Sequence, residues 1–152
     1  MTNNEKYMRL ALIEAKKAFD KNEVPVGCVI VKDDKVIAKA HNLRQTKKSV
    51  LAHAEILAIQ KASKKLDNWI LEDCTMYVTL EPCPMCAGTI LQSRIKKIVY
   101  ATKEPKFGAC QSVMNLFDYK FNHQVEITDG ILQEEASNLM KNFFQILRQN
   151  KK

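Results

Sequence analysis

The sequence predicts an α/β protein in which helices pack on both faces of one mixed, five-stranded sheet. Segments with helical spacing of apolar residues alternate with short runs rich in β-branched residues. Their order is helix-strand-strand-helix-strand-helix-strand-strand-helix. The chain has 152 residues, of which 46% are hydrophobic and 27% charged, and this suits one soluble domain with one core. We therefore expect residues 1–152 to form a single domain.

The first third of the chain predicts a helix followed by a hairpin. Apolar residues at helical spacing, with lysines on the other side, predict an amphipathic helix over residues 3–21. A short β-branched run predicts a strand over residues 26–31. Asp33-Asp34 then forms a turn into a second strand at residues 36–38. The polar, basic residues 41–49 are expected to form a loop.

The middle of the chain predicts two helices and two strands. Helical spacing returns over residues 52–65, and residues 75–80 give a strong strand signal. Pro84 suits the first turn of a new helix, where its missing N–H costs nothing, and this helix is expected to end near Ser93. Residues 98–100 predict the fourth strand.

The last third of the chain has a weaker pattern. Between residues 101 and 123 Pro and Gly interrupt any regular spacing, and a short helix is expected over residues 112–117. Residues 125–127 predict a last strand, and Asp129-Gly130 a turn. A closing amphipathic helix is expected over residues 132–148.

Charge and cysteine content restrict the class of protein. The net charge is +7 and the pI about 9.2, which favours a polyanionic partner without identifying it. No apolar run approaches the roughly 18 residues of a membrane span, and no signal core begins the chain, so we expect a cytoplasmic protein without membrane contact. Five cysteines, an odd number, favour free thiols and metal ligands over disulfides. Three of them, Cys28, Cys74 and Cys110, are interpreted as buried thiols without a role.

Two short motifs carry the chemistry. His53-Ala54-Glu55 and Cys83-Pro84-Met85-Cys86 both fall at the N-terminus of an expected helix. Cys83 and Cys86 are three residues apart, so both sulfurs face one way on the first helical turn, where the partial positive charge favours thiolate. A single His-x-Glu is usually a surface or core feature, and a single Cys-x-x-Cys can be redox-active or buried. Together they predict a zinc site formed by His53, Cys83 and Cys86.

The zinc site can be structural or catalytic. A closed structural site needs a fourth ligand, and the candidates are Cys28, Cys74, Cys110, His41 and His123. None of these belongs to a second paired spacing of the kind that zinc ribbons have. Three ligands plus water is the catalytic pattern, in which the metal lowers the pKa of water from about 16 towards 7. Glu55 would then accept the proton of that water and pass it to a leaving group.

These motifs resemble the zinc-dependent cytidine and adenosine deaminase superfamily. The similarity to the bacterial tRNA adenosine deaminases covers nearly the whole chain. Its residues are Glu23-Val24-Pro25-Val26-Gly27, His41-Asn42, Ala52-His53-Ala54-Glu55, Tyr77-Val78-Thr79-Leu80-Glu81-Pro82-Cys83, Met85-Cys86-Ala87-Gly88, Asn122-His123 and Phe143-Phe144. The resemblance implies a three-layer α-β-α cytidine deaminase-like fold and one Zn²⁺ per subunit. It also implies a homodimer with a composite active site that converts the wobble adenosine of a tRNA anticodon stem-loop to inosine.

The resemblance also implies residue roles. Glu55 would protonate the adenine ring and later the departing ammonia. Asn42 would hold the base, and the backbone N–H of Ala54 would donate to the developing oxygen. The remaining positions would contact the anticodon loop: Lys106, Asn122, His123, Phe144 and Arg148. The alternatives stay open, because an Asn here can simply stabilise a loop and paired Phe residues near a helix end often belong to the core.

Three positions depart from the family pattern. Glu104 stands where an Asp is usual, Ser49-Val50-Leu51 replaces Asp-Pro-Thr, and Gln111-Ser112 replaces Gly-Ser. All are expected near the RNA and none at the metal, so the identity of the tRNA and the way it is held are less constrained than the chemistry.

Two other functions remain possible at this point. A deaminase of free nucleobases or nucleosides, of the guanine or cytosine type, would share the zinc site. The basic segments 44–48 and 148–152 argue against it, because a small neutral substrate needs no phosphate contacts. A structural zinc module that binds nucleic acid without chemistry would have no use for Glu55 and would supply a fourth ligand.

Overall fold

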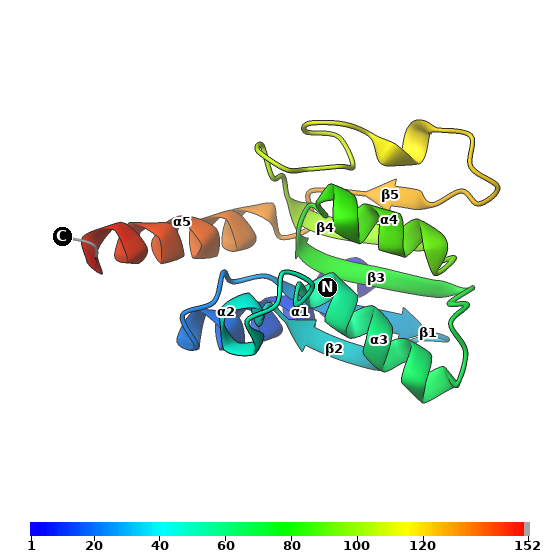
Figure 1. Cartoon of the computed structure of the whole chain (residues 1–152), viewed down its shortest axis with the longest axis horizontal. Coiled ribbons are helices and arrows are strands. Elements are labelled where there is room, and N and C mark those ends of the chain that lie inside the picture. The colour runs from blue at the N-terminus through cyan, green and yellow to red at the C-terminus, as the bar shows by residue number, and fades with distance from the viewer. Residues whose placement is uncertain (151–152) are drawn as a thin grey trace.

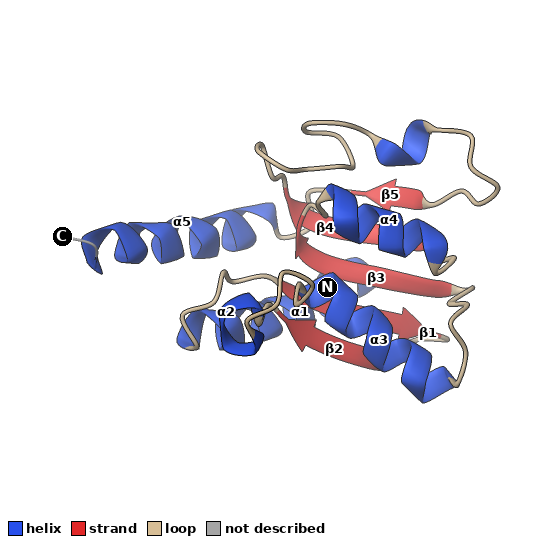
Figure 2. Cartoon of the chain, viewed as in Figure 1, coloured by secondary structure: helices blue, strands red, loops and turns tan. Residues whose placement is uncertain are grey.

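A mixed five-stranded sheet forms the centre of the molecule, and helices cover both of its faces (Figures 1 and 2). The computed structural model describes residues 1–150. The helices are α1 (Asn3–Asp20), α2 (Arg44–Lys47), α3 (Ala54–Leu66), α4 (Pro84–Gln92), the 3₁₀ turn η1 (Leu116–Asp118) and α5 (Gln133–Asn150). The strands are β1 (Gly27–Lys32), β2 (Lys35–His41), β3 (Cys74–Leu80), β4 (Lys97–Thr102) and β5 (Glu126–Thr128). Within residues 1–150, none of these helices is both long and apolar enough to span a membrane.

The sheet combines an antiparallel half with a parallel half. Its strand order is β2-β1-β3-β4-β5, with β1 antiparallel to both neighbours and β3, β4 and β5 parallel to one another. The β1–β2 hairpin turns at Asp33 and Asp34, whose φ angles of +51° and +59° are those that a tight two-residue hairpin turn requires. The parallel β3–β4 pair is joined by α4, because parallel neighbours need a crossover. The expected mixed sheet is confirmed.

Each face of the sheet packs against its own pair of helices. Successive side chains of a strand point to opposite faces, so two separate apolar layers form. On one face, Val29 and Tyr77 pack with residues of α1 and with Ala136 of α5. On the other face, Ile30 and Met76 pack with residues of α3 and α4. The expected three-layer α-β-α arrangement is therefore confirmed.

The helix α2 was missed by the sequence analysis, which predicted a loop over residues 41–49. The buried carboxylate of Glu23 accepts hydrogen bonds from the backbone N–H groups of Gln45 (3.1 Å) and Thr46 (2.7 Å). These N–H groups have no partner inside a first helical turn. Because the cap comes from a residue 22 positions earlier in the chain, the local pattern does not reveal it.

The other differences concern the ends of elements. The strand expected over residues 36–38 extends over Lys35–His41, because β1 pairs with it along its length as far as Gly27 opposite His41. The short helix expected over residues 112–117 is only the turn η1. The other expected elements are present, with bounds that differ by two residues or fewer.

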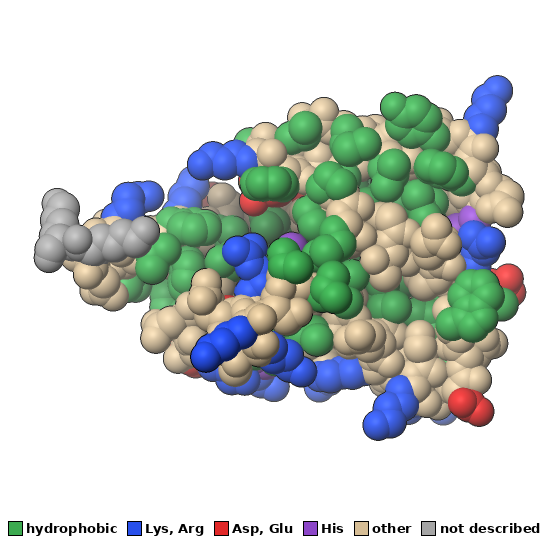
Figure 3. Space-filling model, viewed as in Figure 1, with side chains coloured by type: hydrophobic (Ala, Val, Ile, Leu, Met, Phe, Trp, Pro, Cys, Tyr) green, Lys and Arg blue, Asp and Glu red, His purple; other side chains and the backbone are tan. Residues whose placement is uncertain are grey.

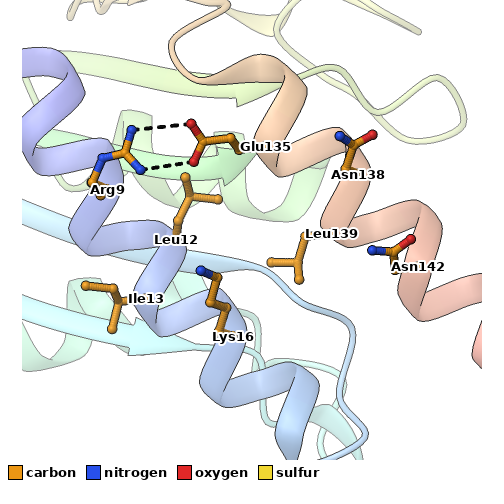
Figure 4. Close-up of a pocket in the computed structure, with 8 residues that line it drawn as sticks. All are labelled: Arg9, Leu12, Ile13, Lys16, Glu135, Asn138, Leu139 and Asn142. Atoms are coloured by element: carbon orange, nitrogen blue, oxygen red, sulfur yellow. Dashed lines mark hydrogen bonds and ion pairs between the residues drawn. The ribbon is translucent and has the colours of Figure 1, made fainter.

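The helix α5 lies beside α1 on one face of the sheet. A shallow groove between them, with a volume of about 290 Å³, has Leu12 and Leu139 on its sides. Figure 4 shows the groove bridged by an ion pair, in which Arg9 donates to the carboxylate of Glu135 at 3.0 and 3.3 Å. Figure 1 shows the later turns of α5 extending beyond the sheet. Beside them, Figure 3 shows the molecule hollowed between α5 and the segment around α2.

Candidate active site

Three potential metal ligands meet where α3 and α4 begin. His53 and Cys83 are the N-cap residues of α3 and α4, and Cys86 lies in the first turn of α4. The Nδ1 atom of His53 lies 3.5 Å from the sulfur of Cys86 and 3.8 Å from that of Cys83. All three ligand atoms lie within 4.8 Å of one another. The structure thus brings together the three residues that the sequence analysis selected.

The donor set fits a tetrahedral zinc ion. With Zn–N near 2.1 Å and Zn–S near 2.3 Å, a tetrahedron separates nitrogen from sulfur by about 3.6 Å. The observed separations of 3.5 and 3.8 Å bracket this value. Within residues 1–150, no fourth His, Cys, Asp or Glu joins the cluster. His41 and His123 are engaged elsewhere, with Glu14 and with the carbonyl of Ile95.

The two thiols are electrostatically unequal. The pKa of Cys83 is lowered to about 4, first because the Cys86 thiol donates to its sulfur and then because His53 lies beside it. The pKa of Cys86 is raised, because its proton is held by Cys83 and because the group is buried. Two thiols that share one proton make a good ligand pair for a divalent cation, which displaces that proton. The site is therefore suited to a metal whose binding releases protons.

Glu55, two residues after His53, is almost entirely enclosed. Glu55 lies in the first turn of α3, is 4% exposed, and has its side chain beside Cys86 of α4. Burial raises the pKa of Glu55 to about 7. Both protonation states are then accessible near neutral pH, as a group that must both accept and donate a proton requires.

Asn42 and Ala54 are joined to each other. The side-chain oxygen of Asn42 accepts a hydrogen bond of 2.8 Å from the backbone N–H of Ala54. This bond satisfies a free N–H in the first turn of α3 and fixes the start of the helix beside His53. The loop-stabilising role of Asn42 is thus observed. The predicted donation from Ala54 to a developing oxygen would require this N–H to leave Asn42.

Two of the metal ligands, His53 and Cys83, line one cavity of about 560 Å³ together with Glu55, while Cys86 is buried behind them. This volume lies within the range of small-molecule sites. Apolar side chains form most of its wall: Val24, Val26, Val50, Leu80, Met85, Phe107, Met140 and Phe144. The polar groups facing it include Asn42, Arg44 and Glu104. An apolar slot with a few polar groups is the kind of site in which a flat base binds.

Comparison with known proteins places this site in a family. The model of the MafB19-like deaminases matches residues 2–148. A tRNA-specific adenosine deaminase of Bacillus subtilis is 50% identical over the whole chain and 95% of its own length. One from Aquifex aeolicus is 46% identical over 96% of the chain and 97% of its own length. The chain belongs to the MafB19-like deaminase family.

Solved structures agree with the assignment. A structure from studies of A-to-I editing by tRNA deaminases at the wobble position superposes with a TM-score of 0.86. It is 38% identical and covers 88% of this chain and 98% of its own. A guanine deaminase of Bacillus subtilis superposes with a TM-score of 0.64 at 32% identity, over 78% of this chain and 86% of its own. The cytidine deaminase-like fold is therefore confirmed.

The residues expected to contact RNA are distributed over the molecule. Phe144 lines the cavity and is 38% exposed, while its neighbour Phe143 is buried against Phe19. Lys106 and Arg148 are exposed on the loop after β4 and near the end of α5. Their contacts with RNA stay predictions. Residues 151–152 of the basic tail lie outside the described residues.

Asn122 and His123 lie away from the cavity. The Nε2–H of His123 donates to the carbonyl of Ile95 at 2.8 Å, just before β4 begins. The cavity lies at the other end of this strand, where Glu104 follows it. Within one chain, these two residues and the metal ligands are therefore at opposite ends of the sheet.

The departures from the family pattern have different positions. Val50 and Glu104 line the cavity, whereas Gln111 accepts a hydrogen bond of 2.6 Å from the hydroxyl of Tyr100. Cys28, Cys74 and Cys110 are buried as expected, and burial raises the pKa of each thiol.

The sequence analysis missed Glu81, Phe107 and Met140 as residues of this site. Glu81 had a usable signal, because a carboxylate directly before Pro82-Cys83 ends an otherwise apolar strand. Phe107 and Met140 had none, because only the folded chain brings the loop after β4 and the helix α5 to the start of α4.

Proposed function

We propose that this protein is a zinc-dependent hydrolase that deaminates the wobble adenosine of a tRNA anticodon to inosine. The observation that carries the proposal is a buried carboxyl group with a pKa of about 7 beside a three-residue ligand set, at a cavity that this carboxyl group, His53 and Cys83 line. The identity of 50% with a tRNA-specific adenosine deaminase over the full chain supports the same substrate.

Different residues at the cavity would have different roles in the reaction. His53, Cys83 and Cys86 would hold the zinc ion, which when bound supplies a Lewis acid that makes water acidic. Glu55 would take one proton from water and deliver it to the ring nitrogen of adenine. It would then take the second proton, from the oxygen that has added to the base, and deliver it to the amino group, which leaves as ammonia. Asn42 would hold the edge of the base. The apolar wall would exclude bulk water around the base, which strengthens each of these polar contacts.

Basic side chains near the cavity support an RNA substrate. Arg44 reaches the cavity from α2, and Lys47 and Lys48 follow it on the surface. These cations, with Lys106 and Arg148, would meet phosphates on either side of the extruded base. Phe144, partly exposed at the cavity, would contact a neighbouring base. An RNA that functions in the cytoplasm implies the same location for the enzyme.

A homodimer is part of the proposal. Large apolar side chains are exposed on the segments beside the cavity: Val50, Leu51, Phe107 and Val113, each more than half exposed. Figure 3 shows hydrophobic side chains gathered over α4 and the segment that contains η1. Exposed apolar patches of this kind mark protein interfaces. Dimerisation would also allow Asn122 and His123 of one subunit to reach RNA bound at the other.

Nucleoside analysis of RNA tests this function. The purified protein is incubated with an anticodon stem-loop that carries adenosine at the wobble position, and the digested RNA is analysed by mass spectrometry. We expect inosine from this RNA, none from the same stem-loop with guanosine at that position, and no deamination of free adenosine, guanine or cytosine. The rate at low substrate concentration should fall steeply with salt. Deamination of free bases alone, insensitive to salt, would refute the proposal.

A further inference from the structure

The carboxylate of Glu81 has no part in the chemistry proposed above, yet it is among the most completely buried charged groups of the described chain. It directly follows β3 and is 2% exposed. It accepts hydrogen bonds from one segment only, residues 104–112, which we call the β4 loop. Its donors are the backbone N–H groups of Glu104 (3.1 Å), Cys110 (3.0 Å), Gln111 (2.8 Å) and Ser112 (3.0 Å), and the hydroxyl of Ser112.

The geometry requires an acceptor at this place. Three successive N–H groups, those of residues 110–112, converge on one carboxylate oxygen, which is the arrangement in which backbone amides bind an anion. A glutamine would turn an NH₂ group or its weaker carbonyl towards these donors. The fit is also close. A Cβ atom on Gly108 would lie 2.4 Å from the carboxyl carbon of Glu81, so the loop packs directly on this group.

The β4 loop in turn forms one wall of the cavity. Glu104 and Phe107 line the cavity, and the side chain of Phe107 is 65% exposed. A further bond, from the N–H of Ala109 to the carbonyl of Pro82 at 2.9 Å, joins the loop to the residue before Cys83. The position of this wall therefore depends on residues 81–82, which also lead directly into the metal ligands.

We propose that Glu81 is a positioning residue that sets substrate specificity, by holding the β4 loop where it receives the nucleotides beside the extruded base. The proposal rests on the function proposed above. Glu81 does not touch the reacting atoms. It fixes Glu104, Lys106 and Phe107 relative to the cavity, and polynucleotide binding depends on it more than the chemical step does.

The test compares Glu81→Gln with Glu14→Gln. Glu14 is also a buried carboxylate, 5% exposed, and it pairs with Lys17 and His41 outside the cavity, so its replacement controls for the loss of a buried charge. For Glu81→Gln we expect KM for the anticodon stem-loop to rise about tenfold or more, with kcat changed less and zinc retained. We also expect native trypsin cleavage after Lys106 to accelerate while cleavage after Lys65 keeps its rate. For Glu14→Gln we expect neither change.

A second variant keeps the test decisive if Glu81→Gln does not fold. Gly108→Ala keeps the carboxyl group of Glu81 and displaces the loop by its Cβ atom, so it should raise KM and accelerate cleavage after Lys106 in the same way. Unchanged KM and unchanged cleavage after Lys106 in the folded variants would overturn the proposal, and so would equal effects of Glu14→Gln. If the wild type fails to deaminate the stem-loop, the proposed function is wrong. The rate of trypsin cleavage after Lys106 in the variants then still decides whether Glu81 holds the loop.

Discussion

Replacing Glu55 by Gln tests the catalytic assignment most directly. The change keeps the shape of a side chain that is 4% exposed and removes only its ability to exchange a proton. Proton transfer by a positioned group contributes about 10²- to 10⁴-fold to rates. The barrier should therefore rise by about 3 to 5 kcal/mol. Burial raises the pKa of Glu55 to about 7, so both of its protonation states are accessible near neutral pH.

Single-turnover deamination of the anticodon stem-loop, with inosine measured by mass spectrometry, gives this rate. Zinc content by elemental analysis and binding of the stem-loop are measured on the same samples, and Glu14→Gln is the control for altering a buried carboxylate. We expect one zinc per chain, binding within about threefold of the wild type, and a rate reduced by at least about 100-fold. A rate within tenfold of the wild type, with zinc retained, would refute the assignment of Glu55 as the proton-transfer group.

Four further outcomes are expected. Cys86→Ser should lower zinc content well below one per chain, measured after dialysis at neutral pH, whereas Cys28→Ser should leave it unchanged. Gly27→Ala should destabilise the fold by about 1 to 3 kcal/mol in urea unfolding, because its Cβ would lie 1.9 Å from the carbonyl oxygen of Ala11. Gly88→Ala, with nothing within 4 Å of its Cβ inside a helix, should instead stabilise by about 1 kcal/mol. Burial acts to raise the pKa of Glu23, but hydrogen bonds from Thr46 and Gln45 outweigh it and the pKa is lowered from 4.5. The stability that Glu23 contributes is thus present above pH 4.5 and is lost as pH falls through its lowered pKa. In Glu23→Gln, the free energy of unfolding measured by circular dichroism should therefore fall less steeply as the pH is lowered.

Local signals were sufficient for most of the fold. Helical spacing of apolar residues and β-branched runs predicted the order of the regular elements, because these periodicities follow from backbone geometry alone. The same holds for the metal ligands. Two short motifs place His53, Cys83 and Cys86 at the starts of two helices. Because both helices pack on the same face of the sheet, these three ligands then meet at one end of it.

Contacts between distant parts of the chain decided the rest. The short helix α2 forms because Glu23 caps it from 22 residues away, and the β4 loop takes its shape from Glu81. The position of Phe107 and Met140 in the cavity, and of His123 at the far end of β4, likewise depends on how layers pack. The sequence by itself determined which atoms can bind a metal and exchange a proton, because residue type and local spacing carry that chemistry. Only the tertiary structure decided the shape of the cavity around them, because its walls are formed by side chains, most of them apolar, from separate segments of the chain.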